Sequence, residues 1–244
     1  MASTRPGAGR GREVVARRDA CEHGAVSGLL CLQGGRELTP PCAEMDAAVL
    51  RRARVRRVAV LAGAARVGDD YDGASQRARR HYEELGATVA VVPDPRVDRD
   101  AALDALDDDV QLLVLPGGSP SSLLDVVAGD VGRRVRHLQH EGTAISGASA
   151  GAMVLCQRVV RPDRGDVVDG LGLVEGLALP HWEPGSADRW DVPAGITWGL
   201  PECGGVLIDG TSCEAIGRGS PSVRAGGDWQ PLERSSRPGG TDPR

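Results

Sequence analysis

Short runs of aliphatic residues recur along the chain, and longer stretches with helical periodicity separate them. The clearest runs are GLLCL at 28–32, RVAVLA at 57–62, TVAVV at 88–92 and VQLLVL at 110–115. A strand that is apolar at every position is buried on both faces, which is typical of a parallel sheet covered by helices. The pattern therefore predicts an α/β fold, a three-layer sandwich with a mostly parallel central sheet.

The remaining segments extend this alternation. Helices are expected at 43–54, 71–85, 100–106, 121–127, 131–141 and 150–157, and further strands at 143–146, 172–179, 205–208 and 213–217. We expect one domain over residues 25–225. It is flanked by an Arg/Gly-rich tail at 1–24 and a Gly/Pro/Ser-rich tail at 226–244, both poorly ordered. In such folds ligands bind at the carboxyl ends of the strands, which is where functional residues are expected.

Composition excludes several classes of protein. A hydrophobic content of 41% is too high for a disordered chain, and no apolar run is long enough to span a membrane. The net charge of -5 and the 2% aromatic content argue against nucleic-acid binding. No membrane or nucleic-acid partner is therefore expected, and a homodimer remains an open alternative.

Cysteine spacing and the first residues bear on location and metals. The six cysteines form no C-x-x-C pair, and MASTRPGAGRGR contains no apolar segment of a signal peptide. We therefore expect a cytoplasmic protein with free, buried thiols. His137 and His140 have the i, i+3 spacing of metal ligands, but no third ligand of the right type lies nearby, so no metal site is predicted.

The segment Gly147–Gly151 fits the pattern G-x-S-x-G. It lies between an expected strand and an expected helix, which is the setting of a nucleophile elbow with Ser149 at its tip. The helix directs its N-terminal N–H groups at the serine, and the Ala150 N–H is a candidate oxyanion donor. The alternative is a turn of small residues that packs a helix on a sheet.

A nucleophilic serine needs a base, and His181 is the candidate. It follows the apolar run Leu177–Leu179 and Pro180, so it is expected at a strand end, with Trp182 beside it in the substrate site. His23 lies in the expected tail and His81 in a charged helix. The alternative for His181 is a packed loop histidine.

The base in turn needs an acid that orients it. Asp209 is the first candidate, because it follows the apolar run Val206–Ile208 and precedes a Gly-Thr turn. Asp166 is the second candidate and Asp163 the third, both lying between the serine and the histidine. Each could instead serve only as a turn or capping residue.

A glycine-rich loop, Pro116–Ser119, follows another expected strand. Adjacent glycines let bare N–H groups approach a substrate oxygen, so Gly118 is the second candidate oxyanion donor, with Gly117 and Ser119 lining the substrate site. The alternative is a turn followed by a helix cap at Ser119.

Taken together, these segments resemble peptidase family S51, which includes dipeptidase E and cyanophycinase. The matching segments are LCLQGG at 30–35, VAVLAGAA at 58–65, LGATVAVV at 85–92, LVLPGGSPSSLL at 113–124, ISGASAGAM at 145–153, DGLGLVEGLALPHW at 169–182 and GVLIDGTSCEAIGRG at 205–219. The resemblance implies a class I glutamine amidotransferase-like, flavodoxin-like fold in which a serine replaces the amidotransferase cysteine. It implies a Ser/His/acid triad, exopeptidase or isopeptidase activity on Asp-containing peptides, and no metal or organic cofactor.

The resemblance also assigns roles to individual residues. It makes Ser149 the nucleophile, His181 the base, and Gly118 and Ala150 the oxyanion donors. Asp209 matches the acid of cyanophycinase-like members, whereas dipeptidase E-like members use an Asp between the serine and the histidine. The Pro-His-aromatic stretch at 180–182 is closer to dipeptidase E, and Arg189 is the candidate for binding an acidic substrate side chain.

Two other functions remain open from the sequence. One is an α/β-hydrolase esterase, which also uses G-x-S-x-G, although only 32 residues separate Ser149 from His181. The other is a binding or regulatory module that keeps the elbow without turnover.

Overall fold

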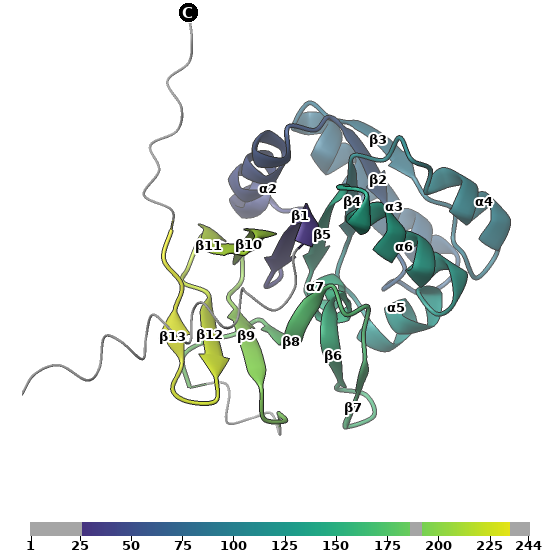
Figure 1. Cartoon of the computed structure of the whole chain (residues 1–244). Helices are drawn as coiled ribbons and strands as arrows, with labels where there is room; N and C mark the ends of the chain where they lie inside the picture. Colours follow the sequence, from purple (N-terminus) through teal and green to yellow (C-terminus); the bar gives the residue numbers. More distant parts are fainter. Residues whose placement is uncertain (1–25, 186–191, 235–244) are drawn as a thin grey trace, which may run out of the picture.

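The structure is a computed structural model that describes residues 26–185 and 192–234 (Figure 1). Its helices are α2 (Pro40–Ala53), α3 (Asp69–Glu84), α4 (Arg99–Ala105), α5 (Pro120–Val126), α6 (Asp130–His140) and α7 (Ala150–Leu155). The first strands are β1 (Val26–Gln33), β2 (Arg57–Val60), β3 (Thr88–Val91), β4 (Leu112–Leu115) and β5 (Ala144–Ala148). The later ones are β6 (Cys156–Arg161), β7 (Asp166–Asp169), β8 (Val174–Pro180), β9 (Ile196–Leu200), β10 (Gly204–Gly210), β11 (Ser212–Gly217), β12 (Ser222–Ala225) and β13 (Gln230–Pro231).

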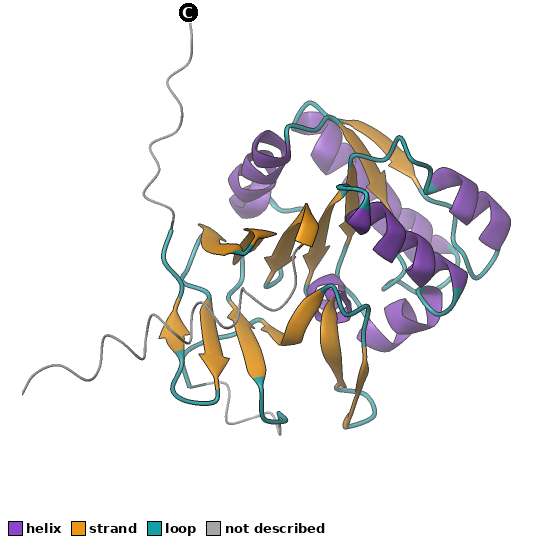
Figure 2. Ribbon diagram, in the orientation of Figure 1, coloured by secondary structure: helices purple, strands orange, loops and turns teal. Residues whose placement is uncertain are grey.

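The central sheet has the strand order β11-β10-β1-β5-β4-β2-β3. The five strands from β1 to β3 in this order run parallel, and β10 and β11 add an antiparallel edge. Helices cover the sheet, as Figure 2 shows. The predicted α/β fold with a mostly parallel central sheet is therefore confirmed.

Alternate residues of each central strand enter two different cores. Leu113 and Leu115 pack with α4 to α7, whereas Leu112 and Val114 pack with α2 and α3. Because successive side chains of a strand point to opposite faces, only a strand apolar at every position can serve both cores. This requirement explains the continuous aliphatic runs of the sequence.

A second sheet, of order β13-β12-β9-β8-β6-β7, was not predicted. Helix α7 lies between the two sheets and contacts β5, β6 and β8 (Figure 1). The helix predicted over 150–157 is wrong at its end, because strand β6 begins at Cys156 directly after α7. Trp198 and Val223 of the second sheet pack in the same core as strands β1, β4 and β5.

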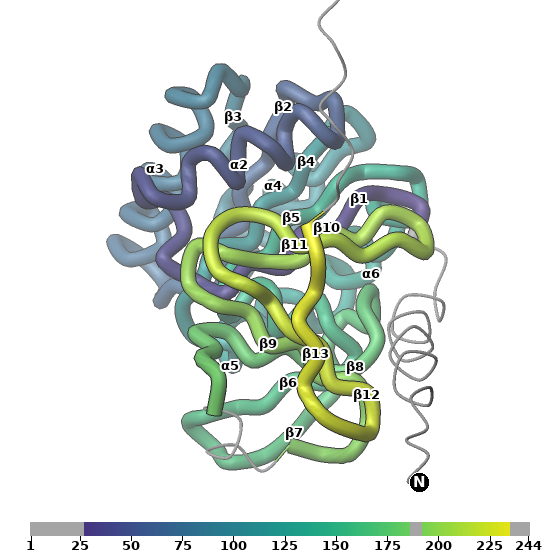
Figure 3. The backbone as a smooth tube through the Cα atoms, turned by 90° about the vertical axis from the view of Figure 1, so that its left-hand side faces the viewer, coloured from purple at the N-terminus to yellow at the C-terminus, as the bar shows by residue number. Residues whose placement is uncertain are grey.

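The chain beyond residue 225 continues into the second sheet. Strand β13 pairs with β12, Leu232 is buried, and Figure 3 shows both strands beside β9. The predicted boundary of the C-terminal tail at 226 is therefore too early. The predicted N-terminal tail at 1–24 lies outside the described residues.

The cysteines meet the expectation of free thiols only in part. Cys31, Cys42, Cys156 and Cys203 are free and buried, and burial raises the pKa of the Cys31 thiol to about 12. Cys213, in contrast, is disulfide-bonded. The expectation of free thiols therefore holds for four cysteines and is wrong for Cys213. The cysteines taken together no longer support the expected cytoplasmic location. In the described part of the chain, no helix is both long and apolar enough to cross a bilayer.

Candidate functional site

Ser149 lies in a sharp turn between β5 and α7. Its φ of 49° and ψ of -111° are sparsely populated for a residue with a side chain, and such strain is often found at functional sites. A Cβ at Gly147 would lie 2.6 Å from the carbonyl carbon of Gly151, and one at Gly151 would lie 2.0 Å from the Leu115 oxygen. The turn therefore requires glycine on both sides of Ser149.

His181 follows β8 and faces the serine. Its Nε2 lies 3.1 Å from the Ser149 Oγ, and its backbone φ is 53°. The imidazole rests on Gly35, where a Cβ would lie only 2.3 Å from the ring carbon Cε1. The glycine at this position leaves the space that the imidazole occupies.

The acid that faces His181 is Glu202, which follows β9. Its Oε1 lies 3.3 Å from His181 Nδ1, and its Oε2 forms an ion pair of 3.5 Å with Arg36. With a proton on Nδ1, the imidazole donates to the carboxylate and leaves Nε2 free to accept from the serine hydroxyl. The side chains of His181 and Glu202 are about half exposed, so a substrate can reach them from solvent.

Three consecutive carbonyls at the end of β1 hold this arrangement together. Gln33 accepts from the Ser149 N–H at 2.9 Å, Gly34 from the His181 N–H at 2.8 Å, and Gly35 from the Cys203 N–H at 3.0 Å. Cys203 is the residue after Glu202. One short segment therefore fixes the backbone at the serine, at the histidine and beside the acid.

The structure does not bring any of the three predicted acids to His181. Asp209 pairs with Arg52 at 3.5 Å, at the end of β10 where Gly210 lies beside Val26, the first residue of β1. Because β10 is antiparallel to β1, Asp209 lies at the end of the sheet where β1 begins, whereas Ser149 lies at the end where β1 and β5 finish.

The other two candidates have partners of their own. Asp166 pairs with Arg161 across the β6–β7 hairpin, and this guanidinium holds the pKa of the Asp166 carboxyl below its ordinary value. Asp163 accepts a hydrogen bond of 2.8 Å from the Ser121 hydroxyl. The sequence-based choice of Asp209, Asp166 or Asp163 is thus corrected to Glu202 as the acid that contacts the histidine.

The predicted oxyanion donors come from the helix that follows the serine and from the loop after β4. Ala150 is the first residue of α7, and Gly118 has a φ of 145° in the loop after β4. A Cβ at Gly118 would lie 2.5 Å from the Ala64 oxygen, so the loop needs glycine there. Ser119 caps α5, since its hydroxyl accepts from the Ser122 N–H at 3.2 Å.

One predicted substrate-binding residue, Trp182, differs from expectation, and another, Arg189, is not tested. Trp182 is only 7% exposed, and its ring packs against Gly199 and, at 5.2 Å between ring centroids, against Trp229. It is therefore a core residue next to His181 and not a wall of an open site. Arg189 lies outside the described residues.

Sequence reasoning missed three residues of this site: Arg36, Glu37 and Glu202. A signal for Glu202 was present, since the run ITWGL at 196–200 is followed by Pro-Glu, the same strand-end pattern that favoured Asp209. Glu37 accepts a hydrogen bond of 2.7 Å from the Gly117 N–H. Nothing in the local sequence indicates that contact, because 80 residues separate the two partners.

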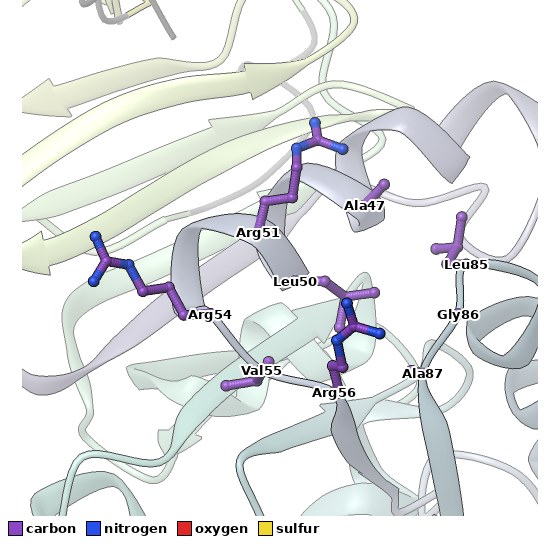
Figure 4. A pocket seen from close by; sticks show the side chains of 9 residues that line it. All are labelled: Ala47, Leu50, Arg51, Arg54, Val55, Arg56, Leu85, Gly86 and Ala87. Carbon is purple, nitrogen blue, oxygen red and sulfur yellow. The ribbon is translucent and has the colours of Figure 1, made fainter. Parts of the chain in front are cut away.

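A pocket of about 360 Å³ lies elsewhere, between the end of α2 and the turn before β3. Figure 4 shows its arginines, Arg51, Arg54 and Arg56, with guanidinium groups that point in different directions. The pocket opens at the N-terminal ends of β2 and β3 and beside the carboxyl end of a helix, whose dipole disfavours anions. It is separate from the site around Ser149.

Comparisons with known proteins show the family and the fold of this chain. The family model described as "Peptidase family S51" matches residues 35–214, most of the chain. A peptidase from an acI-B1 Actinobacterium has a similar structure, with a TM-score of 0.72, 21% identity, and coverage of 87% of this chain and 97% of that one. The "Putative Peptidase E Protein" from Listeria monocytogenes EGD-e has a TM-score of 0.62 and 14% identity, with 79% of this chain and 99% of that one covered.

No curated protein matches the sequence. The two structural likenesses show the fold, and the family model, which spans the glycine loop after β4, the serine turn and the histidine, shows the family. The chain belongs to peptidase family S51 and is a serine-type peptidase.

Proposed function

We propose that Ser149, His181 and Glu202 form the catalytic triad of this peptidase. The observation that carries the proposal is the continuous contact from Ser149 Oγ to His181 Nε2 and from Nδ1 to Glu202. His181 takes the proton of the serine hydroxyl as Oγ attacks the scissile carbonyl, and Glu202 stabilises the imidazolium. His181 then returns the proton to the leaving amine, and water hydrolyses the acyl-enzyme by the reverse proton transfers.

The N–H groups of Gly118 and Ala150 stabilise the tetrahedral oxyanion in this proposal. In support, Ala150 follows Ser149 directly at the start of α7, and Gly118 follows Gly117, where a Cβ would lie 3.0 Å from the Ser149 Cβ. Preorganised backbone donors need no rearrangement as charge develops. The substrates are short, Asp-containing peptides, cleaved by a dipeptidase or isopeptidase reaction. Support for this class is the family membership together with the Pro-His-Trp segment at 180–182, which is closer to dipeptidase E than to cyanophycinase. The family match also argues against the α/β-hydrolase esterase.

A fluorophosphonate probe tests the nucleophile without assuming a substrate. Because the probe reacts with an activated serine hydroxyl, we expect stoichiometric labelling of the folded protein at Ser149, located by mass spectrometry of the labelled peptide. Asp-X dipeptides, β-Asp-Arg and Asp-free dipeptides are assayed in parallel. Labelling at the background rate, with no peptide cleaved, would mean a binding module in place of an enzyme.

Gly35→Ala tests whether the position of the His181 ring matters for turnover. A methyl group at residue 35 would overlap the imidazole, and alanine rarely adopts the φ of 133° found there, so the ring and the backbone beside it must shift. A displacement of about 1 Å in a catalytic group costs on the order of 100-fold in rate, and we expect kcat to fall by about that factor.

The matched control for this substitution is Gly73→Ala in α3, where the nearest atom to a new Cβ is the mobile end of Arg77 at 3.4 Å. It should leave kcat unchanged. Thermal unfolding of both variants separates a shift of His181 from a loss of fold. A Gly35→Ala enzyme with the kcat of the control would show that turnover does not depend on the observed position of the His181 imidazole.

A further inference from the structure

Glu37 brings a carboxylate to the edge of the nucleophile site. Its Oε1 accepts the Gly117 N–H at 2.7 Å, and it lies 2.5 Å from the point that a Cβ of Gly117 would occupy. The Cβ of Ser149 lies 3.0 Å from that same point. Glu37 and Ser149 therefore border one small volume, in front of the glycine loop.

The backbone around Glu37 is strained in a way that directs side chains to the site. Arg36 and Leu38, on either side of it, have φ values of 56° and 60°, which are uncommon for residues with a side chain. The segment sends Arg36 to Glu202 and Glu37 to Gly117. Two adjacent charged residues of one strained loop thus reach opposite sides of the Ser149–His181 pair.

The two charges of this loop differ in how they are compensated. Arg36 is neutralised by Glu202, whereas Glu37 forms no ion pair with any basic side chain of the described residues. A partly buried carboxylate without a cation is unfavourable, because it has lost water without gaining a counter-charge. It also lies beside Ser149, where a negative oxyanion must develop during amide hydrolysis.

A cation supplied by the substrate would relieve both costs. In a peptide cleaved after its first residue, the α-ammonium is two bonds from the scissile carbonyl carbon that Ser149 attacks. This short, fixed spacing suits a carboxylate that borders the same volume as the serine. A cation at the end of a long side chain would lie farther from Glu37.

We propose that Glu37 binds the α-ammonium group of the substrate and thereby restricts this peptidase to peptides with a free amino terminus. The inference rests on the proposed function of Ser149. Glu37 accepts charge-assisted hydrogen bonds from the ammonium and offsets its own repulsion of the oxyanion only when that cation is present. A substrate with a blocked amino terminus cannot donate these hydrogen bonds to Glu37. It also leaves the repulsion between the Glu37 carboxylate and the oxyanion uncompensated.

Glu37→Gln tests the charge while keeping an acceptor for Gly117. The peptide that the wild type cleaves fastest is assayed in free and N-acetylated form, together with an N-acetyl-Arg peptide that carries its cation on the side chain. We expect the wild type to prefer the free form by about 100-fold in kcat/KM, and Glu37→Gln to lower this ratio at least about tenfold. The free peptide should lose rate and the acetylated one should gain.

The controls separate recognition from damage to the site. Glu44→Gln, at an exposed position of α2, should leave the ratio unchanged. Fluorophosphonate labelling of Ser149 in Glu37→Gln should be at least as fast as in the wild type, because the probe carries no cation, and a loss of labelling would indicate damage to the nucleophile site. Calorimetry on inactive protein measures binding without turnover. The double variant Ser149→Ala/Glu37→Gln should bind the free peptide more weakly than Ser149→Ala alone.

Several results would overturn the inference. One is an unchanged ratio of kcat/KM in Glu37→Gln, and others are an equal loss or an equal gain of rate with the free and the acetylated peptide. Another is a wild type that cleaves the N-acetyl-Arg peptide at the same rate as the free peptide. Equal loss means a structural role for Glu37, and equal gain means that the carboxylate merely obstructs the site. A wild type that cleaves nothing and is not labelled removes the proposed function itself, and this inference with it.

Discussion

Ser149→Ala is expected to lower kcat by about 10⁶-fold, the scale of loss seen when the nucleophile of a Ser/His/acid triad is removed. The substitution deletes the Oγ that lies 3.1 Å from His181 and leaves no group that can form an acyl-enzyme. The backbone turn is kept, because alanine meets the same φ and ψ constraints as serine. Steady-state hydrolysis of the preferred peptide measures the effect, and circular dichroism verifies the fold.

Ser220→Ala, at an exposed position between β11 and β12, is the matched control for this loss. It removes the same atom at a position outside the site and should retain wild-type kcat and labelling. A Ser149→Ala protein that still cleaves peptide well above the uncatalysed rate would place the nucleophile elsewhere.

Glu202→Gln is expected to lower kcat by roughly 10² to 10⁴-fold, since an amide in place of the orienting acid favours the wrong imidazole tautomer and does not stabilise the imidazolium. The lower end of this range reflects the exposure of the pair, in which solvent screens part of the interaction. KM should change little, because the carboxylate contacts His181 and Arg36 on the far side of the ring from Ser149.

Asp209→Asn is the control that decides between the two acids. Asp209 is exposed and pairs with Arg52 at the strand ends opposite those that carry Ser149 and His181. Its amide variant should therefore retain kcat within about twofold, because surface substitutions far from a site have small effects. The reverse pattern, an inactive Asp209→Asn and an active Glu202→Gln, would contradict the assignment of Glu202.

The strand runs and the serine turn were predictable because their causes are local. A strand that serves two cores must be aliphatic throughout, and a turn that passes close to its own helix must be built of small residues. His181 was predictable for a similar reason, since it follows the buried run of β8 directly. The structure brings Ser149 and His181 together as the sequence analysis expected.

The acid was mispredicted because its position depends on strand direction. Asp209 and Glu202 both follow an apolar run, and the runs look equally suitable in the sequence. In the fold, β9 is parallel to β8 and delivers Glu202 to His181, whereas β10 is antiparallel to β1 and carries Asp209 away. Direction within a sheet is set by tertiary pairing, which the residues of one strand do not encode.

The second sheet was missed for a related reason. Two of its strands, β6 and β7, mix polar and apolar residues, and Arg158 pairs with Asp169 at their surface. Such strands bury one face only, and their short lengths give little periodicity to detect. Glu37 likewise escaped notice, because its contact with Gly117 joins two loops that meet only after the sheet has formed.

The three carbonyls of Gln33–Gly35 have a consequence for folding. They join the end of β1 to residues more than a hundred positions away, so the site forms only after the most distant pairings of the chain are in place. Contacts of such long sequence separation form slowly and late. A nascent or partly folded chain would thus carry no working hydrolase, and recovery of activity during refolding should follow the last step of assembly and not the collapse of the sheet.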